Sequence, residues 1–366
     1  MLALLAGCST PTPAPLPPTP AATATPVLAP TATPVGVATA TAVPAAPTPT
    51  TAPASASGSG SAATVMLSGY LDDRSTPSGL VLSLYNAINR KEYLRAYSYW
   101  ETPASDPNVG SFEHYSAGFQ STVSVQVTLG SINSGVGAGQ IYYVVPVALK
   151  AQTAGGQTQA YSGCYTLHLG NPASQTAPPF HSLGIQSAEL KPAGADANLN
   201  ALLASACAPA SGTLNPVPTT DPNTIAASNY LDDRSDAVTV LSSLFNAVNR
   251  HEYARAYSYW QSPTQTFEQF QQGYQNTAAV EATFGTPTGD AGAGQMRFRV
   301  PVALKASAAD GKIQYFAGCY QLHLAQPAIQ GVPPFQPLGI ERAVVKAVAG
   351  QADASGQMAG VCANMQ

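Results

Sequence analysis

The sequence predicts two tandem α+β domains that follow a disordered stalk, and three observations support this. The stretch Tyr70–Trp100 recurs as Tyr230–Trp260 with the same motifs. In each copy, apolar residues at helical spacing are followed by apolar residues in alternation, which indicates helices and then antiparallel strands. Residues 9–64 are almost entirely Pro, Thr, Ala, Ser, Val and Gly, and contain no charged or aromatic residue.

The composition limits the partners that we expect. The chain has 366 residues and a formal net charge of −4, and only 9% of its residues are charged. Globular proteins usually have about 25% charged residues. This balance is too weakly basic for a nucleic-acid surface and too weakly acidic for a solvating tail. Without residues 1–64, about 150 residues remain for each copy, which is a common domain size.

The start of the chain, Leu5-Ala6-Gly7-Cys8, resembles the lipobox of bacterial lipoproteins. The resemblance implies that residues 1–8 are a signal remnant and that Cys8 is lipidated. The apolar run before Cys8 is shorter than the usual 7–15 residues and has no charged residue ahead of it. No later segment has the roughly 18 apolar residues that a membrane span needs. We therefore expect a lipid anchor in the cell membrane and an extracytoplasmic location.

Two segments are predicted linkers. Residues 9–64 cannot bury enough apolar surface to offset their ordering entropy, and their prolines favour an extended stalk. Residues 211–228 have a similar composition. The predicted domains are therefore residues 65–210 and 229–366.

Each copy is expected to begin with helices. The first starts after Thr76-Pro77, because Thr is a good N-cap and Pro suits the first helical position. In the second copy we expect Ser235 to be the cap and Asp236 to favour the positive helix start. A second helix covers the Tyr93 region and its counterpart, and a third helix covers residues 112–120 and 267–275. The apolar positions of the first helix are Leu80, Val81, Leu84, Tyr85 and Ile88, matched by Val240, Leu241, Leu244, Phe245 and Val248.

Strands are expected after the helices, because the period changes to two. In the first copy they cover residues 122–129, 141–149, about 161–168 and 182–191, and a helical tail covers 196–207. Pro146 and Pro301 lie inside the second of these strands, which predicts a bulge or an edge position. Arg297 and Arg299 replace Tyr142 and Val144, so these positions should face solvent. Ile141, Tyr143, Val145 and Val147 should face the core.

The helical motif Y-N-A-I-N-R-K-E-Y-x-R-A-Y-x-Y-W, followed by long strands, resembles the nuclear transport factor 2-like superfamily. Ketosteroid isomerase-like and SnoaL-like domains belong to it. The resemblance covers both domains and implies that a curved sheet wraps the helices into a cone with an apolar pocket. Enzymes of this superfamily place carboxylates or His in the cone, and no such set is evident in this sequence.

The cysteines give the strongest chemical signal. The chain has five, and lipidation of Cys8 would leave two pairs. Cys164 and Cys207 are 43 positions apart, as are Cys319 and Cys362. We expect intradomain disulfides in an oxidising compartment, with free buried thiols as the alternative. The spacing does not suit a metal site.

Few polar residues are candidates for catalysis. Asp72-Asp73-Arg74 and Asp232-Asp233-Arg234 form the only charged triplet that both copies share. We interpret one Asp as a helix cap and Arg74 as the partner of a neighbouring acid, although an acid/base role in a dry pocket is an alternative. His168 and His323 occupy equivalent strand positions and are interpreted as structural. We predict no catalytic residue, cofactor or metal.

Aromatic residues are the candidates for pocket lining. Aromatic walls with a few hydroxyls suit small-molecule sites, although core packing explains many such residues equally well. The candidates are Tyr93, Tyr97, Trp100, Tyr143 and Tyr165 in the first copy, and Tyr253, Tyr257, Trp260, Phe298 and Tyr320 in the second.

These features lead to three hypotheses about function. The first is a lipid-anchored protein with two non-catalytic binding or scaffolding domains at the cell envelope. Its partner would be a cell-wall polymer, an envelope protein or a small apolar ligand, and two similar sites on one tether would gain avidity. The alternative is a ketosteroid isomerase-like or dehydratase-like enzyme with its pocket inside the cone. In the third, the first domain is a spacer and the second, with Arg297 and Arg299, is the working unit.

Overall fold

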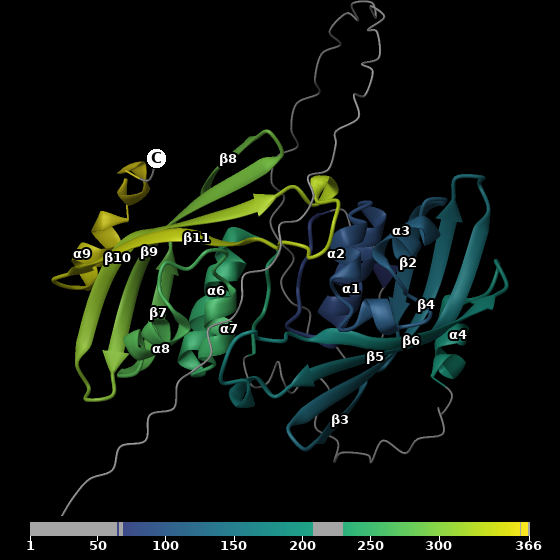
Figure 1. The fold of residues 1–366 in the computed structure, drawn as a ribbon, viewed down its shortest axis with the longest axis horizontal. Helices are drawn as coiled ribbons and strands as arrows, with labels where there is room; N and C mark the ends of the chain where they lie inside the picture. The colour runs from purple at the N-terminus through teal and green to yellow at the C-terminus, as the bar shows by residue number, and fades with distance from the viewer. Residues whose placement is uncertain (1–63, 66–68, 208–229, 359, 365–366) are drawn as a thin grey trace, which may run out of the picture. The chain divides into compact units, whose positions relative to one another are not determined.

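The structure is a computed structural model that describes residues 64–65, 69–207, 230–358 and 360–364. It contains two similar units of helices and antiparallel strands (Figure 1). This confirms the predicted tandem α+β architecture. Cys8 and nearly all of the predicted stalk and linker lie outside the described residues.

In the first repeat three helices precede the long strands, and a further helix closes the unit. The elements are β1 (Thr64–Val65), α1 (Pro77–Asn89), α2 (Tyr93–Tyr97), η1 (Pro103–Ser105), α3 (Phe112–Gly118), β2 (Thr122–Leu129), β3 (Asn133–Gly137), β4 (Gln140–Thr153), β5 (Thr158–Gly170), η2 (Pro172–Ser174), β6 (Gly184–Ala193) and α4 (Leu199–Ala206).

The second repeat follows the same order. Its elements are α6 (Ala237–Asn249), α7 (Tyr253–Ser258), α8 (Phe267–Gly273), β7 (Thr277–Phe284), β8 (Thr288–Gly292), β9 (Gln295–Ala308), β10 (Ile313–Ala325), η3 (Pro327–Ile329), β11 (Gly339–Val348), α9 (Gln351–Gln357) and η4 (Val361–Asn364).

Each repeat has its own antiparallel sheet. The described strand order is β1-β2-β4-β5-β6 in the first and β7-β9-β10-β11 in the second. Short strands β3 and β8 pair with β4 and β9 and complete the sheets. These two strands were not predicted, because NSGVG and TGDAG lack the apolar alternation that marks a half-buried strand.

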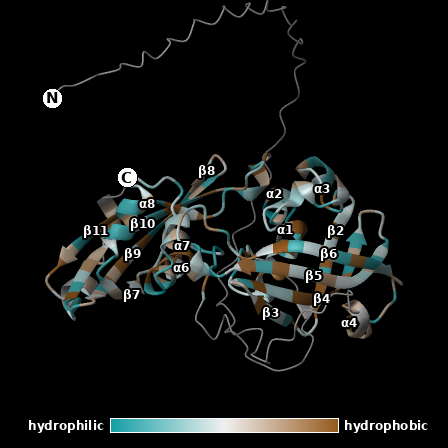
Figure 2. Cartoon of the chain, turned by 60° about the horizontal axis from the view of Figure 1, so that its bottom comes forward, coloured by the Kyte–Doolittle hydropathy of each residue, from teal (hydrophilic) through white to brown (hydrophobic). Residues whose placement is uncertain are grey.

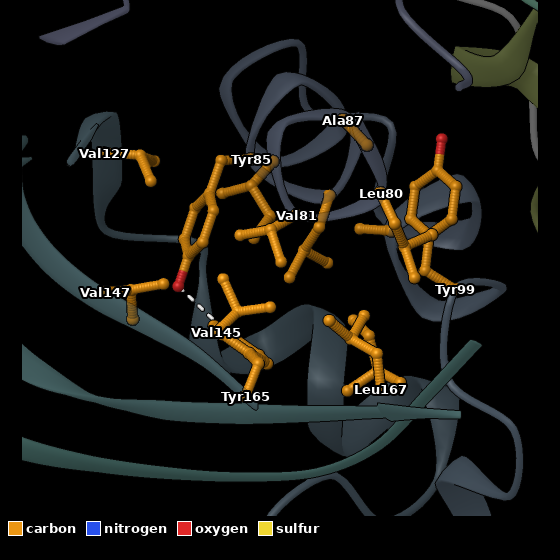
Figure 3. Packing of buried hydrophobic residues seen from close by; sticks show 14 of the residues in the cluster. Leu80, Val81, Tyr85, Ala87, Tyr99, Val127, Val145, Val147, Tyr165 and Leu167 are labelled. Carbon is orange, nitrogen blue, oxygen red and sulfur yellow. Dashed lines mark hydrogen bonds between the residues drawn. The ribbon is translucent and has the colours of Figure 1, made fainter. Parts of the chain in front are cut away.

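The core of each repeat lies between the first helix and one face of the sheet. On β5 the buried positions Tyr165, Leu167 and Leu169 alternate with half-buried ones. They meet Leu80 and Val81 of α1, as Figure 3 shows for part of this cluster. Figure 2 shows that hydrophobic and hydrophilic positions follow one another along these strands. The predicted alternation is therefore confirmed.

The helix starts agree with the prediction in the first repeat and differ in the second. Thr76 is the N-cap of α1, and its side chain accepts a hydrogen bond from the Gly79 N–H. In α6 the N-cap is Asp236, which forms a capping box with Thr239. The prediction that Ser235 caps this helix is wrong, because its hydroxyl has another partner, described below.

Pro146 and Pro301 lie in central strands, so the predicted edge position is wrong. Beside each proline the neighbouring chain has one extra residue, which agrees with the alternative of a bulge. One side of β4 pairs with β2 as far as Val147 and with β3 from Val144 onward. Pro146 lies in the gap between the two, where its carbonyl accepts a hydrogen bond from Gly130 at 2.8 Å. The nitrogen and carbonyl of one strand residue point to the same side, so the missing N–H of Pro146 faces this gap. The proline therefore removes no bond from the sheet.

Candidate functional site

The first repeat contains a cavity of about 640 Å³ between its helices and its sheet. The helices α1 and α3 and the strands β2, β4, β5 and β6 contribute to its wall. Leu84, Ile88 and Leu149 give the wall an apolar surface. A volume of this size is typical of a small-molecule site.

Four tyrosines line this cavity: Tyr85, Tyr115, Tyr161 and Tyr165. The hydroxyls of Tyr85 and Tyr165 share a hydrogen bond of 2.7 Å (Figure 3). Burial raises the pKa of Tyr85 well above its usual value and that of Tyr165 to about 12. These phenols therefore remain neutral at physiological pH, when each can donate and accept a hydrogen bond.

Trp100 also lines the cavity. Its indole Nε1 is buried and, among the described residues, has no hydrogen-bond partner of good geometry. It lies close enough to the Tyr115 hydroxyl to lower the pKa of that phenol, although burial is the larger effect and the net shift is upward. A donor indole and a phenol hydroxyl are thus adjacent in the wall.

The acidic and basic residues of the described wall lie at its exposed margin. His114, Glu189 and Lys191 all line the cavity, and all three are exposed. The charges of Glu189 and Lys191 oppose each other. The buried part of the described wall is therefore apolar surface with neutral phenol and indole groups.

The second repeat has a smaller cavity of about 370 Å³ in the corresponding place. Three of the four tyrosine positions are phenylalanines there, Phe245, Phe270 and Phe316, and only Tyr320 is kept. At one position the exchange is reversed, because Phe119 of the first cavity corresponds to Tyr274 of the second. The second cavity is thus smaller and has two phenols where the first has four.

The structure places the predicted pocket residues of the first repeat in different environments. Trp100 and Tyr165 line the cavity. Tyr93 and Tyr97 donate hydrogen bonds to backbone carbonyls beside α3, at 3.2 and 2.9 Å. Tyr143 is 2% exposed and belongs to the hydrophobic core. The sequence did not single out the lining residues Tyr85 and Tyr115, which the helical spacing alone assigns to the core.

In the second repeat only Tyr320 of the predicted residues belongs to the cavity wall. Tyr253 and Tyr257 donate hydrogen bonds to backbone carbonyls, at 3.4 and 2.8 Å. Trp260 and Phe298 pack against the second core. Trp260 and Phe298 therefore have the environment given above as the alternative to pocket lining, namely core packing.

The triplets Asp72-Asp73-Arg74 and Asp232-Asp233-Arg234 pair with each other. The N–H of each arginine donates to the carbonyl of the first aspartate in the other triplet, at 2.8 Å in both directions. The middle aspartates form an isolated antiparallel bridge. Ser75 and Ser235 repeat the exchange, since each hydroxyl accepts a hydrogen bond from the first aspartate N–H of the other triplet, at 2.8 and 2.9 Å. The shared triplet therefore joins the two repeats.

The charged side chains of each triplet interact with residues close to them in the chain. Arg74 forms the expected ion pair with Asp72 at 3.7 Å. The expectation that an Asp of the triplet caps the helix is wrong in both repeats, where the N-caps are Thr76 and Asp236. Asp73 and Asp233 instead accept hydrogen bonds from the N–H groups two residues later, both at 2.8 Å. Burial raises the pKa of Asp73, and it raises that of Asp233 to about 6. These carboxyls lie at the junction and not in the wall of either cavity.

His168 has a carboxylate partner that was not predicted from the sequence. Its Nδ1 lies 2.8 Å from Glu101 Oε1, and its Nε2 faces Gln140. In the second repeat Gln261 occupies the place of Glu101, and its oxygen lies 3.0 Å from Nδ1 of His323. Burial lowers the pKa of His323. Because Glu101 lies 67 positions before His168, only the fold could reveal the pair.

Disulfides link Cys164 to Cys207 and Cys319 to Cys362, with Cα–Cα distances of 5.4 and 5.3 Å. Cys164 alternates with the core-facing residues of β5, so it lies on the opposite face of the sheet. There the bond holds the end of α4, which packs on β4 and β5. The two disulfides indicate an oxidising, extracytoplasmic location.

No protein-family model, curated protein or solved structure matches this chain. Within the described ranges, no helix is both long and apolar enough to cross a membrane. The same residues contain no group of three or more His, Cys, Asp or Glu side chains that could hold a metal ion.

Proposed function

We propose that this protein is a lipid-anchored, extracytoplasmic binding protein whose two nuclear transport factor 2-like domains act without catalysis. The observation that carries the proposal is the cavity of about 640 Å³ in the first repeat, with neutral hydroxyls inside and charges at its margin. Apolar cavities of this size with a few fixed polar groups suit small organic ligands. The binding of a small, mainly apolar molecule is therefore the function that this cavity favours.

The family proposal rests on the arrangement of elements around the cavity. In each repeat helices precede an antiparallel sheet, and the cavity lies between them, as the resemblance of the helical motif implies. A shared fold can serve many functions, so the proposed role depends on the cavity itself.

The proposed location combines two features. The disulfides need an oxidising compartment. Leu5-Ala6-Gly7-Cys8 would attach a lipid to Cys8, and residues 9–64 would separate the domains from the cell membrane. A protein held there could capture a ligand at the envelope, whereas a cell-wall polymer or an envelope protein would use an outer surface.

The distribution of acids favours binding over catalysis. An isomerase-like or dehydratase-like mechanism needs a carboxylate or His held within reach of the substrate inside the pocket. Glu189 and His114 are the carboxylate and the His in the described wall of the first cavity, and both are exposed. The Glu101–His168 pair and the buried junction aspartates do not contribute to that wall.

Native mass spectrometry of the full chain, exported by a bacterial host and purified in detergent, tests the proposal. We expect a mass increase from lipid on Cys8 and a second, non-covalent increase from a co-purifying small molecule. The variant Cys8→Ser should lose the first increase and keep the second. A chain that carries no small molecule and binds none from a panel of small apolar compounds would contradict the binding role.

A further inference from the structure

The segment that joins the second helix to the third differs in length between the two repeats. Eleven residues, 101–111, separate Trp100 from α3, whereas six residues, 261–266, separate Trp260 from α8. The helices and strands on either side correspond in the two repeats. Connecting these elements therefore does not require the five additional residues of the first repeat.

Both segments end at the same anchor. The Tyr97 hydroxyl donates a hydrogen bond to the Gly110 carbonyl at 2.9 Å, and the Tyr257 hydroxyl donates to the Gln265 carbonyl at 2.8 Å. In both repeats the next residue is the N-cap of the following helix. The additional residues therefore form a bulge of the chain between two points that the repeats share.

This longer segment contributes to the wall of the first cavity. Val109 is 2% exposed, belongs to the hydrophobic core and lines the cavity together with Asn108. A turn holds it there, because the Asp106 carbonyl accepts hydrogen bonds from the N–H groups of Val109 and Gly110 at 3.2 and 2.8 Å. The shorter segment of the second repeat contributes Gln265, which is polar and exposed. A buried apolar side chain in the first wall is thus absent from the second.

The two cavities also differ in how far they extend. Leu84, Ile88 and Trp100 line the first cavity, whereas their counterparts do not contribute to the described wall of the second. The volume falls from about 640 to about 370 Å³. The first cavity therefore reaches α1 positions and the start of the longer segment, which the second cavity does not reach.

The buried part of the first wall favours an uncharged ligand. It contains apolar side chains and the phenols of Tyr85 and Tyr165, whose hydroxyls are bonded to each other at 2.7 Å. His114, Glu189 and Lys191 lie at the exposed margin. A charged group placed inside would lose its hydration without gaining a partner of opposite charge, which is costly.

We infer that residues 102–111 are the specificity segment of the first repeat. Through Val109 they complete a cavity for an uncharged, apolar molecule, which the second repeat binds more weakly. This rests on the proposed binding function and names its ligand class. It reverses the hypothesis that the second domain is the working unit. The arginines on which that hypothesis depended, Arg297 and Arg299, form ion pairs with acids of their own repeat at 3.3 and 3.0 Å.

Two fluorescent probes with the same aromatic body test the ligand class. N-phenyl-1-naphthylamine is uncharged, and 8-anilino-1-naphthalenesulfonate adds one sulfonate to it. The fluorescence of both increases when they move from water to an apolar site, so titration of the full chain with Cys8→Ser gives both dissociation constants without detergent. We expect the uncharged probe to bind roughly tenfold more tightly or better, because the sulfonate has no partner inside the cavity.

A graft from the second repeat tests the segment. Replacing residues 102–111 by the sequence of residues 262–266 keeps the anchoring carbonyl and the helix cap, and should weaken the uncharged probe by roughly tenfold. Val109→Ala removes two carbon atoms from the wall and should weaken it by about three- to tenfold. Ser105→Ala is the matched control, because Ser105 is exposed and lies in the same segment but not in the wall.

The outcomes separate the two proposals. Equal binding of the two probes would overturn the ligand class, and an unchanged affinity in the folded graft would overturn the role of the segment; either result leaves the binding function standing. If the graft does not fold, Val109→Ala decides, because a side chain that serves packing alone would lower the melting temperature without weakening the probe. A wild-type chain that binds neither probe would count against the proposed function and this inference together.

Discussion

Arg95 is the buried charge on which the helix pair of the first repeat depends. Its side chain is 0% exposed. Its Nε donates to Glu92 at 2.7 Å, and a terminal nitrogen donates to Asn86 at 2.8 Å. The other terminal nitrogen donates to the Leu71 carbonyl, and the guanidinium lies 4.4 Å from the centre of the Tyr70 ring. Residues of the helical motif that resembles the superfamily therefore also form a buried network around Arg95.

We expect Arg95→Met to lower the free energy of unfolding of the first repeat by about 3 kcal/mol. Breaking a buried ion pair by removing one partner costs about 3–5 kcal/mol, because the other charge stays buried. Glu92 is only 4% exposed, but Arg90 remains 2.8 Å from it, so the lower end of this range applies. For a domain of this size the melting temperature should fall by about 9 °C, at about 3 °C per kcal/mol.

Urea unfolding of the non-reduced chain measures this loss. In a Trp260→Phe background, Trp100 is the remaining tryptophan, so its fluorescence reports the first repeat. In the matching Trp100→Phe background, Trp260 reports the second repeat, where Arg255→Met should cost as much as Arg95→Met costs the first. There Lys312→Met is the control, because it breaks only an exposed ion pair with Asp310 and should leave the urea midpoint nearly unchanged. A loss below about 1 kcal/mol for Arg95→Met would refute the argument.

Three further predictions concern the Cys164–Cys207 disulfide and the junction between the two triplets. Replacing Cys164 by Ser should destabilise the first repeat by about 3–4 kcal/mol, because the 43-residue separation is no longer constrained in the unfolded chain, and differential scanning calorimetry would show one lowered transition. Asp233 has a folded pKa of about 6 against 3.8 ordinarily, so the folded state holds its proton more tightly. The protonated Asp233 carboxyl therefore adds to the free energy of unfolding below pH 4. This gain, up to about 3 kcal/mol, is lost as the pH rises through 6. Urea titrations at pH 4.5 and 7.5 should show a smaller pH difference for Asp233→Asn, and an unchanged difference would contradict the assignment. The double variant Ser75→Ala and Ser235→Ala leaves two amide N–H groups without their acceptors, at about 1–3 kcal/mol each. Hydrogen exchange at the amides of residues 72 and 232 should then accelerate, and unchanged exchange would mean that the serines do not hold the junction.

Much of the fold could be predicted from the sequence because it depends on local patterns. The alternation of β2, β4 and β5 and the helical spacing of α1 both mark one buried face, and duplication gave each pattern twice. The predictions that were wrong depended on contacts with residues distant in the sequence. Ser235 does not cap α6 because its hydroxyl accepts from Asp72, 163 positions away. Pro146 lies in a central strand because β2 and β3 leave a gap beside it.

The cavity was less accessible to sequence reasoning. An aromatic residue that fills a core and one that lines a cavity follow the same helical or strand spacing, so Tyr143 and Tyr165 could not be told apart. Tyr85 was recognised as an inward-facing helix position, but not as part of a cavity wall. The one signal available was the exchange of tyrosine for phenylalanine between the copies, at Tyr85 and Phe245 and again at Tyr115 and Phe270. A hydroxyl that one copy of a core omits is not needed for packing.

The two repeats keep the same buried network beside the helices but differ in the wall of the cavity. Both copies retain the Glu92–Arg95 network, as Glu252–Arg255, with the same Nε–carboxylate distance of 2.7 Å. The wall of the cavity changes instead, by the loss of hydroxyls and a fall in volume from about 640 to about 370 Å³. If the hydroxyls of the first repeat served packing alone, the second repeat would need them too, because the surrounding helices and strands are the same. The difference is explained if one repeat binds a ligand and the other is free of that requirement.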